Sequence, residues 1–320
     1  MQDEDDGHHE VVLDCGSGGT RIWRVSGEAV QRVAWPGGTK PPVLSKSLAT
    51  ANGRQEFAAA ICALRSRCLI GATAGVRHAL QKGTVTEDEL AALRAELPTG
   101  CVLAVLTPIE EARYELRALR RHVGDAACAM ISMGGKSMQC GRESRLFSLP
   151  FAMHLGFELL QRDAAQTPWR VRVESAAAEY QQRCAEAAAM QGLEPLEGGI
   201  VGITDLVDMA RALKLADRPP LSKAQLLHAL DECVRWYTSQ PDSGEGVSVG
   251  RRIGKADLTL LARALALRAV AERLMADTAT IRFPSGFAIT WTEGYLRGAY
   301  LPRASDCTPC SKDACDSTAT

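Results

Sequence analysis

Aromatic side chains, net charge and long apolar runs are all scarce in this chain of 320 residues. Phe, Trp and Tyr make up 5% of the residues, which is few for a protein that stacks nucleobases on aromatic platforms. The formal net charge is -1, because 37 Lys and Arg face 38 Asp and Glu. No overall basic field attracts nucleic acid, so we expect no nucleic-acid partner.

No apolar run reaches the roughly 20 residues that a membrane-spanning helix needs. The first ten residues are acidic and include His8 and His9, whereas a secretory signal begins basic and continues apolar. The sequence as given therefore predicts a cytoplasmic protein without a membrane segment. A lumenal or extracellular location stays open if a leader or anchor has been removed.

Cysteine is abundant, with eleven residues, an odd number. Most of them lie in apolar runs, a pattern that predicts buried free thiols in a reducing compartment rather than a disulfide framework. Cys307 and Cys310 have metal-ligand spacing, but no second pair follows them. An exposed polar tail is therefore favoured over a zinc site.

The hydrophobic pattern predicts a mixed α/β chain of two domains. We expect an acidic tail over 1–10, a first domain over 11–150, a second, helix-rich domain over 151–302 and a disordered Ser/Thr/Cys tail over 303–320. Strands are predicted over 11–13, 20–25, 101–106, 127–133 and 136–140. Helices are predicted over 87–97, 108–122, 152–162, 169–190, 204–215, 223–239, 255–276 and 291–300.

Two glycine turns each lie between two predicted strands, over 14–20 and 134–137. Such turns can direct backbone N–H groups into a concavity that binds phosphate oxygens, and glycine permits the positive φ that these nests require. Ser17, Thr20 and Ser137 add hydroxyl donors. The first turn has no lysine and leads into a strand, so it is not a P-loop. Two turns that face each other across a cleft would form a phosphate clamp.

Four ordered motifs resemble the apyrase and nucleoside-diphosphatase family. Residues 11–25 (VVLDCGSGGTRIWRV), 72–77 (ATAGVR), 107–114 (TPIEEARY) and 131–139 (ISMGGKSMQ) look like its first four conserved regions, and residues 286–301 look like its closing segment. The related exopolyphosphatase and guanosine-pentaphosphate phosphohydrolase family shares the architecture, and TPIEEARY suits it as well. Both belong to the actin-like superfamily, so the resemblance implies two ribonuclease H-like α/β domains with an interdomain cleft.

The resemblance also implies a role for each matching residue. Glu111 would be the general base that activates water, with Glu110 as the fallback, and Gln139 would orient that water. Asp14 would hold a divalent cation, Mg²⁺ or Ca²⁺, through water. The phosphate-binding residues would be Gly16, Ser17, Gly18, Gly19, Thr20, Thr73, Arg77, Gly134, Gly135 and Ser137.

Each of these residues has a simpler structural role when it is taken alone. Asp14 is suited to capping a turn, Glu110 and Glu111 favour the start of a helix, and Arg77 suits a helix surface. The order and spacing of the four motifs favour the phosphate site. Phosphoanhydride hydrolysis needs held phosphate oxygens, a cation and an oriented water, which is what this set offers.

One departure from the family pattern bears on catalysis. Ser132 stands where the fourth region has an aspartate that shares metal binding, so a weaker cation site is implied. The main prediction is hydrolysis of terminal phosphoanhydrides of nucleoside di- or triphosphates. The alternatives are an exopolyphosphatase or guanosine-pentaphosphate phosphatase and, because of Ser132, a nucleotide-binding regulator with little turnover. A fourth candidate function is that of a small-molecule kinase that uses Asp205. The sequence specifies no oligomeric state.

Overall fold

The computed structural model describes seven stretches of the chain: 10–26, 29–38, 41–124, 128–162, 166–240, 254–286 and 289–300. The expected N-terminal tail up to residue 9 and the whole 303–320 tail, with Cys307 and Cys310, lie outside them. The described cysteines are all free, and most of them are buried. No helix among the described residues is long and apolar enough to cross a membrane.

The first half of the chain forms a five-stranded sheet with the order β3-β2-β1-β4-β5. Its strands are β1 Val11–Gly16, β2 Gly19–Ser26, β3 Ala29–Val33, β4 Cys68–Ala72 and β5 Cys101–Val105. β1 runs antiparallel to β2 and parallel to β4, so the glycine turn after β1 and the chain after β4 meet at one edge of the sheet. The helices of this half are α1 Leu44–Leu48, α2 Ala51–Cys62, α3 Ala74–Gln81 and α4 Glu87–Glu96, after the short 3-10 helix η1 Pro36–Gly38.

A six-stranded sheet with the order β10-β11-β9-β6-β7-β8 forms the second half. Its strands are β6 Ala129–Met133, β7 Met138–Arg142, β8 Arg145–Leu149, β9 Gly199–Thr204, β10 Leu221–Ser222 and β11 Thr280–Arg282. Its helices are α6 Met153–Gln161, α7 Trp169–Gln191, α8 Asp205–Ala212, α9 Lys223–Thr238 and α10 Lys255–Leu274. The Ala- and Leu-rich α10 packs against α6, α7 and α9, and its buried face forms much of this core.

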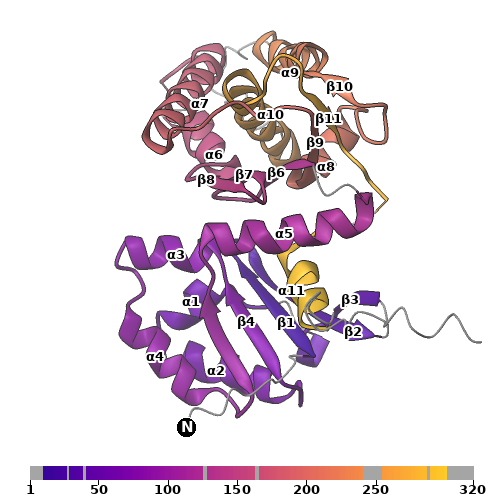
Figure 1. The fold of residues 1–320 in the computed structure, drawn as a ribbon. Helices are drawn as coiled ribbons and strands as arrows, with labels where there is room; N and C mark the ends of the chain where they lie inside the picture. Colours follow the sequence, from indigo (N-terminus) through magenta and orange to yellow (C-terminus); the bar gives the residue numbers. More distant parts are fainter. Residues whose placement is uncertain are drawn as a thin grey trace, which may run out of the picture.

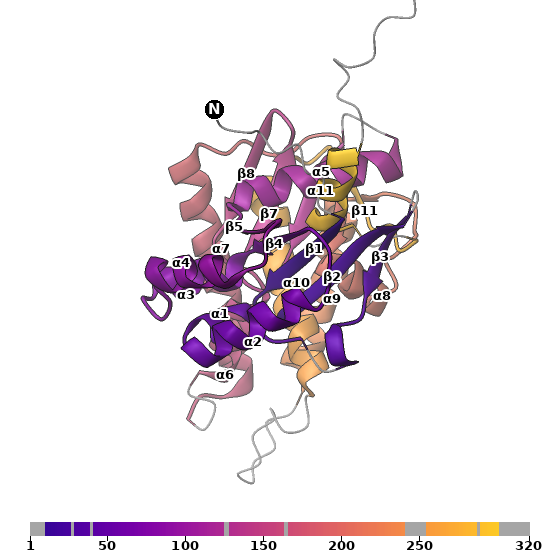
Figure 2. The same ribbon diagram turned by 90° about the horizontal axis from the view of Figure 1, so that it is seen from below.

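Helix α5, Pro108–Val123, lies between the two halves (Figure 1). Its start is fixed by a reciprocal capping box between Thr107 and Glu110, with Pro108 in the first turn. Gly124 ends it in the left-handed conformation. Helix α11, Trp291–Tyr300, comes from the far end of the chain, returns to the first half and packs against α5, β1 and β2 (Figures 1 and 2).

The predicted helices and strands are confirmed within a few residues at each end. The expected change of domain near residue 150 does not coincide with the change of sheet. β6 pairs in parallel with β9, so the second sheet already begins at Ala129, before residue 150. The predicted second domain also contained the helix over 291–300, which packs instead on the first half. Both differences arise from pairings between segments far apart in the sequence.

Candidate active site

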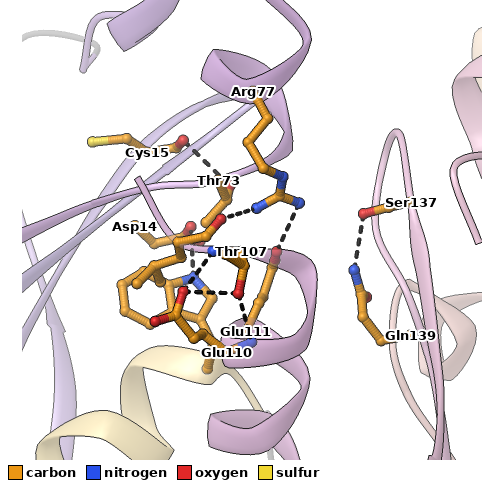
Figure 3. A network of polar contacts seen from close by, with 11 residues as sticks. Asp14, Cys15, Thr73, Arg77, Thr107, Glu110, Glu111, Ser137 and Gln139 are labelled. Atoms are coloured by element: carbon orange, nitrogen blue, oxygen red, sulfur yellow. Dashed lines mark hydrogen bonds and ion pairs between the residues drawn. The ribbon is translucent and has the colours of Figure 1, made fainter. Parts of the chain in front are cut away.

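A cavity of about 750 Å³ is lined by residues of both halves. It brings together most of the site residues predicted from the sequence, which come from the ends of β1, β4 and β6, from the start of α5 and from β7. These are Asp14, Gly16, Ser17, Gly18, Thr73, Glu111, Gly134, Gly135, Ser137 and Gln139. Figure 3 shows Ser137 and Gln139 across the space from Arg77 and Glu111.

The two glycine turns approach each other closely at this cavity. A Cβ atom built on Gly135 would lie 2.8 Å from Ser17 Oγ and 3.0 Å from His154 Nε2, so a larger residue there would have to displace these two side chains. Gly19, at the end of the first turn, has a φ of +145°. The positive φ expected at Gly134 is not found. The loop between the paired Met133 and Met138 has four residues, and such loops are usually built on type I turns, in which φ is negative.

Glu111 is the buried carboxyl group of α5 that faces the cavity. Arg77 donates a hydrogen bond from one guanidinium nitrogen to Glu111 Oε2 at 3.2 Å and another to the carbonyl of Leu106. Burial raises the pKa of Glu111 to about 7, against the opposing charge of Arg77. A carboxyl group with this pKa is half-deprotonated near neutral pH, which suits a general base.

Glu110, the neighbouring residue on α5, has a different environment. Its Oε2 accepts hydrogen bonds from the backbone N–H of Thr107 at 2.7 Å and from the Thr107 hydroxyl at 2.8 Å. These contacts lower the pKa of Glu110. Glu110 caps α5 and does not line the cavity, so the fallback role considered for it has no support in the geometry.

Asp14 lies at the end of β1 and is held by a residue that the sequence analysis missed. Trp291 Nε1, from the start of α11, donates a hydrogen bond to Asp14 Oδ1 at 3.0 Å. Arg21 forms an ion pair with Asp14 Oδ2 at 3.2 Å. Burial raises the pKa of Asp14, while the hydrogen bond from Trp291 and the charge of Arg21 oppose the rise. Asp14 and Trp291 are 277 positions apart, so no local pattern could have revealed their contact.

Glu115 is a second buried carboxyl group that the sequence analysis did not single out. It follows Glu111 by one helical turn, lines the same cavity and is 4% exposed. Burial and the charges of Glu111 and Asp14 raise the pKa of Glu115 well above its ordinary value, and a hydrogen bond from Ser132 opposes the rise. The i, i+4 spacing of Glu111 and Glu115, which places both on one face of the helix, was the sequence signal that could have indicated Glu115.

Thr204 closes the cavity at the end of β9 in an unusual backbone conformation. Its φ is 59° and its ψ is -128°, a combination that a β-branched residue rarely adopts. Thr204 Oγ1 accepts a hydrogen bond from Met133 N at 3.0 Å and lies 3.1 Å from Ser132 Oγ. These contacts hold Ser132 and Met133 against the end of β9. Asp205, the candidate aspartate of a kinase, forms an ion pair with Arg263 at 3.2 Å.

Three predicted phosphate-binding residues do not line the cavity. The hydroxyl of Thr20 donates to the carbonyl of Pro42 at 2.7 Å. Gly19 forms the strand side of the turn, where it pairs with Gly16. Arg77 forms an ion pair with Glu111 Oε2 at 3.2 Å.

Alanine in place of Gly75 is expected to weaken phosphate binding about tenfold or more. A Cβ atom at Gly75, in the first turn of α3, would lie 2.9 Å from Ser17 Cα and 3.0 Å from Ser17 N, so the first glycine turn must shift. Isothermal titration with a non-hydrolysable phosphate compound measures the change. Gly53→Ala on α2 is the control, because its Cβ would lie equally close to backbone, 2.7 Å from the Ser47 carbonyl, outside the cavity lining. Equal affinities in both variants would contradict a phosphate-binding role for the turn.

The donor groups around the cavity fit a hard divalent cation. Asp14, Glu111 and Glu115 are oxygen donors, and Glu115 Oε2 is buried without a hydrogen-bond partner among the described residues. No group of three His, Cys, Asp or Glu side chains in the described part of the chain has the spacing of a metal site. The carboxylates of Asp14, Glu111 and Glu115 are the groups that would hold a hydrated Mg²⁺ or Ca²⁺ here.

Comparisons with known proteins give a fold but no sequence family. No protein-family model matches the chain, and no curated protein matches it. Solved structures do match. The Ppx/GppA family member of Aquifex aeolicus superposes with a TM-score of 0.56 at 16% identity, over 90% of this chain and 96% of that chain. The type II variant of the Aquifex aeolicus Ppx/GppA phosphatase superposes with a TM-score of 0.55 at 16% identity, over 91% of this chain and 99% of that chain.

An exopolyphosphatase from Cytophaga hutchinsonii is also similar, with a TM-score of 0.53 at 14% identity, over 90% of this chain and 97% of that chain. None of these structures is an apyrase, so the comparisons support the exopolyphosphatase side of the resemblance and do not support apyrase specifically. Identities this low establish architecture alone. The chain has the two-domain, actin-like α/β fold of the Ppx/GppA phosphatases.

Proposed function

We propose that the chain hydrolyses terminal phosphoanhydride bonds, with Glu111 as the general base. The observation that carries this proposal is a buried carboxyl group with a pKa of about 7, in a cavity between two glycine turns. Backbone N–H groups of such turns hold phosphate oxygens, and a carboxylate of this pKa can take a proton from water at neutral pH.

The reaction needs few protein groups. The turn after β1 and the turn between β6 and β7 hold the terminal phosphate from two sides, and Gln139 lies beside Ser137, to whose hydroxyl it donates a hydrogen bond at 2.9 Å. Glu111 accepts a proton from water as the water oxygen bonds to phosphorus, and the bridging P–O bond breaks toward the remaining phosphate chain. A divalent cation held near Asp14 would neutralise the phosphate oxygens.

We propose an extended phosphate compound as the substrate, either polyphosphate or a guanosine pentaphosphate, ahead of the nucleoside di- or triphosphates that the sequence favoured. The names of the structural neighbours support this order. Two lysines support it as well: Lys136, in the second glycine turn, and Lys82, whose charge acts on Lys136 while that of Glu158 opposes it. Burial and the charge of Lys82 lower the pKa of Lys136, and burial and the charge of Lys136 lower the pKa of His154. Cations that oppose one another in this way favour a polyanion.

Charge removal at Lys82 and Lys136 is expected to raise the KM for long-chain polyphosphate about tenfold, which corresponds to about 1.4 kcal/mol, and to change the KM for ATP less. Phosphate release by the Lys82→Gln/Lys136→Gln variant is measured on polyphosphate, guanosine pentaphosphate, ATP and ADP, with Mg²⁺ or Ca²⁺ and with a chelator. Lys46→Gln on the exposed surface of α1 is the control.

The same panel separates the remaining functions. Release from ATP and ADP alone would restore the nucleoside phosphatase. Tight binding without release from any compound would indicate a regulator. Equal loss on ATP and polyphosphate would show that the lysines serve phosphate in general and not a long chain.

A further inference from the structure

The second buried glutamate of α5 has no role in the proposed reaction, yet its environment is unusual. Glu111 and Glu115 are separated by one helical turn, so both project from the same face of α5 into the cavity. Glu115 is 4% exposed. One of its oxygens accepts a hydrogen bond from Ser132, and Oε2 has no hydrogen-bond partner among the described residues.

Among the described residues, no cation is found to act on Glu115. The charges that act on it are those of Glu111 and Asp14, both negative. Arg77 is paired with Glu111, and Arg21 is paired with Asp14. A buried carboxylate oxygen that lacks a donor is unfavourable, and a cavity open to water allows a hydrated cation to satisfy it.

Ser132 explains how the carboxylate is oriented. Its hydroxyl lies 3.1 Å from Thr204 Oγ1, and either oxygen can be the donor of that hydrogen bond. When Thr204 donates its proton to Ser132 Oγ, the single Ser132 proton is available to Glu115, in line with the hydrogen bond between them. An aspartate at 132 would instead place a second negative charge against Glu115.

We propose that Glu115 and Asp14 together hold the divalent cation, with Glu115 supplying the negative charge that Ser132 does not. Glu115 on α5 and Ser132 on β6 both line the cavity. This inference deepens the proposed function and rests on it only for the use made of the cation, because cation binding can be measured without turnover.

Mn²⁺ binding to the full chain tests the inference. Mn²⁺ is titrated by electron paramagnetic resonance, with Mg²⁺ as competitor and no phosphate compound present. Glu115→Gln is expected to weaken Mn²⁺ binding tenfold or more, and Ser132→Ala, which removes the hydroxyl that holds Glu115, about threefold. The exchanged variant Ser132→Asp/Glu115→Gln is expected to regain affinity to within about threefold of wild type. Glu110→Gln on the same helix is the control and should bind as wild type does.

The outcomes are distinct. Wild-type affinity in Glu115→Gln, or no Mn²⁺ binding by the wild type in the millimolar range, would overturn the inference. Failure of the exchanged variant to regain affinity, although circular dichroism shows it to be folded, would overturn it too. If Glu115→Gln does not fold, the other two variants decide. Wild-type Mn²⁺ affinity in Ser132→Ala, or no regained affinity in a folded Ser132→Asp/Glu115→Gln variant, would then overturn the inference. Cation binding as expected without phosphate release would leave this inference standing and remove the proposed function, whereas release with unchanged binding in Glu115→Gln would do the reverse.

Discussion

Glutamine at position 111 is expected to lower kcat by roughly 10²–10⁴-fold and to leave the affinity for the phosphate compound near that of wild type. The amide keeps the shape of the side chain and can still accept the hydrogen bond that Arg77 donates. It cannot take a proton from water. Single-turnover phosphate release and isothermal titration on the same preparation separate the chemical step from binding.

The neighbouring glutamate provides a matched control. Glu110→Gln removes one carboxylate from the same turn of α5, but Glu110 caps the helix through Thr107 and does not line the cavity. We expect little loss of stability, because the amide oxygen of Gln can still accept the hydrogen bond from Thr107 N, and a kcat within a few-fold of wild type. A near-normal rate for Glu111→Gln, or a large loss of rate for Glu110→Gln, would contradict the assignment of the base.

The raised pKa of Glu111 allows a second measurement on Glu111→Gln, namely its stability as a function of pH. Burial raises this pKa from 4.5 to about 7, so the folded protein binds a proton more tightly than the unfolded chain does. The free energy of unfolding therefore falls as the pH rises from about 4.5 through 7. In a chelator at pH 8, Glu111→Gln is expected to melt at a higher temperature than wild type, and below pH 4.5 the difference should disappear. For the wild type, kcat/KM should fall on the acid side of about pH 7.

Local rules explain why much of the chain was predictable. The start of α5 is predicted by the capping box of Thr107 and Glu110 and by the proline after Thr107. The capping box of Thr86 and Glu89 predicts the start of α4 in the same way. The two glycine turns lie between alternating apolar runs, so the hairpins that carry Ser17 and Ser137 follow from sequence alone. The motif order then predicted that these turns share a site, and the cavity brings them together.

Contacts over long sequence distances account for what was missed. The parallel pairing of β6 with β9 moves the start of the second sheet ahead of residue 150, and no local signal encodes that partner. Trp291 reaches Asp14 from the other end of the chain, because α11 returns to the first sheet. The importance of Glu115 depends on its facing Ser132 across two elements, which is visible only once α5 and β6 are placed.

The close contact between α11 and α5 gives the second large expected effect. A Cβ atom on Gly294 would lie 1.7 Å from the carbonyl oxygen of Tyr114, so Gly294→Ala must push the two helices apart. Alanine within a helix is ordinarily the more stable residue, but overpacking at this distance should cost about 3 kcal/mol or more. The shift also acts on the site, because α5 carries Glu111 and Glu115, and α11 carries Trp291 on Asp14.

Displacements of about 1 Å at reacting groups can lower rates roughly 10²-fold, so Gly294→Ala should lose activity even at temperatures where it is fully folded. Leu296→Ala on the same helix is the comparison. Leu296 is fully buried beside Val12 and Leu69, and its truncation leaves a cavity that costs about 2–5 kcal/mol without driving α5 and α11 apart. Denaturant unfolding measures stability, and phosphate release well below the melting temperature measures kcat. We expect Leu296→Ala to lose stability with little change in kcat and Gly294→Ala to lose both. A Gly294→Ala variant as active as Leu296→Ala would show that the spacing of the two helices does not set the geometry around Asp14 and Glu111.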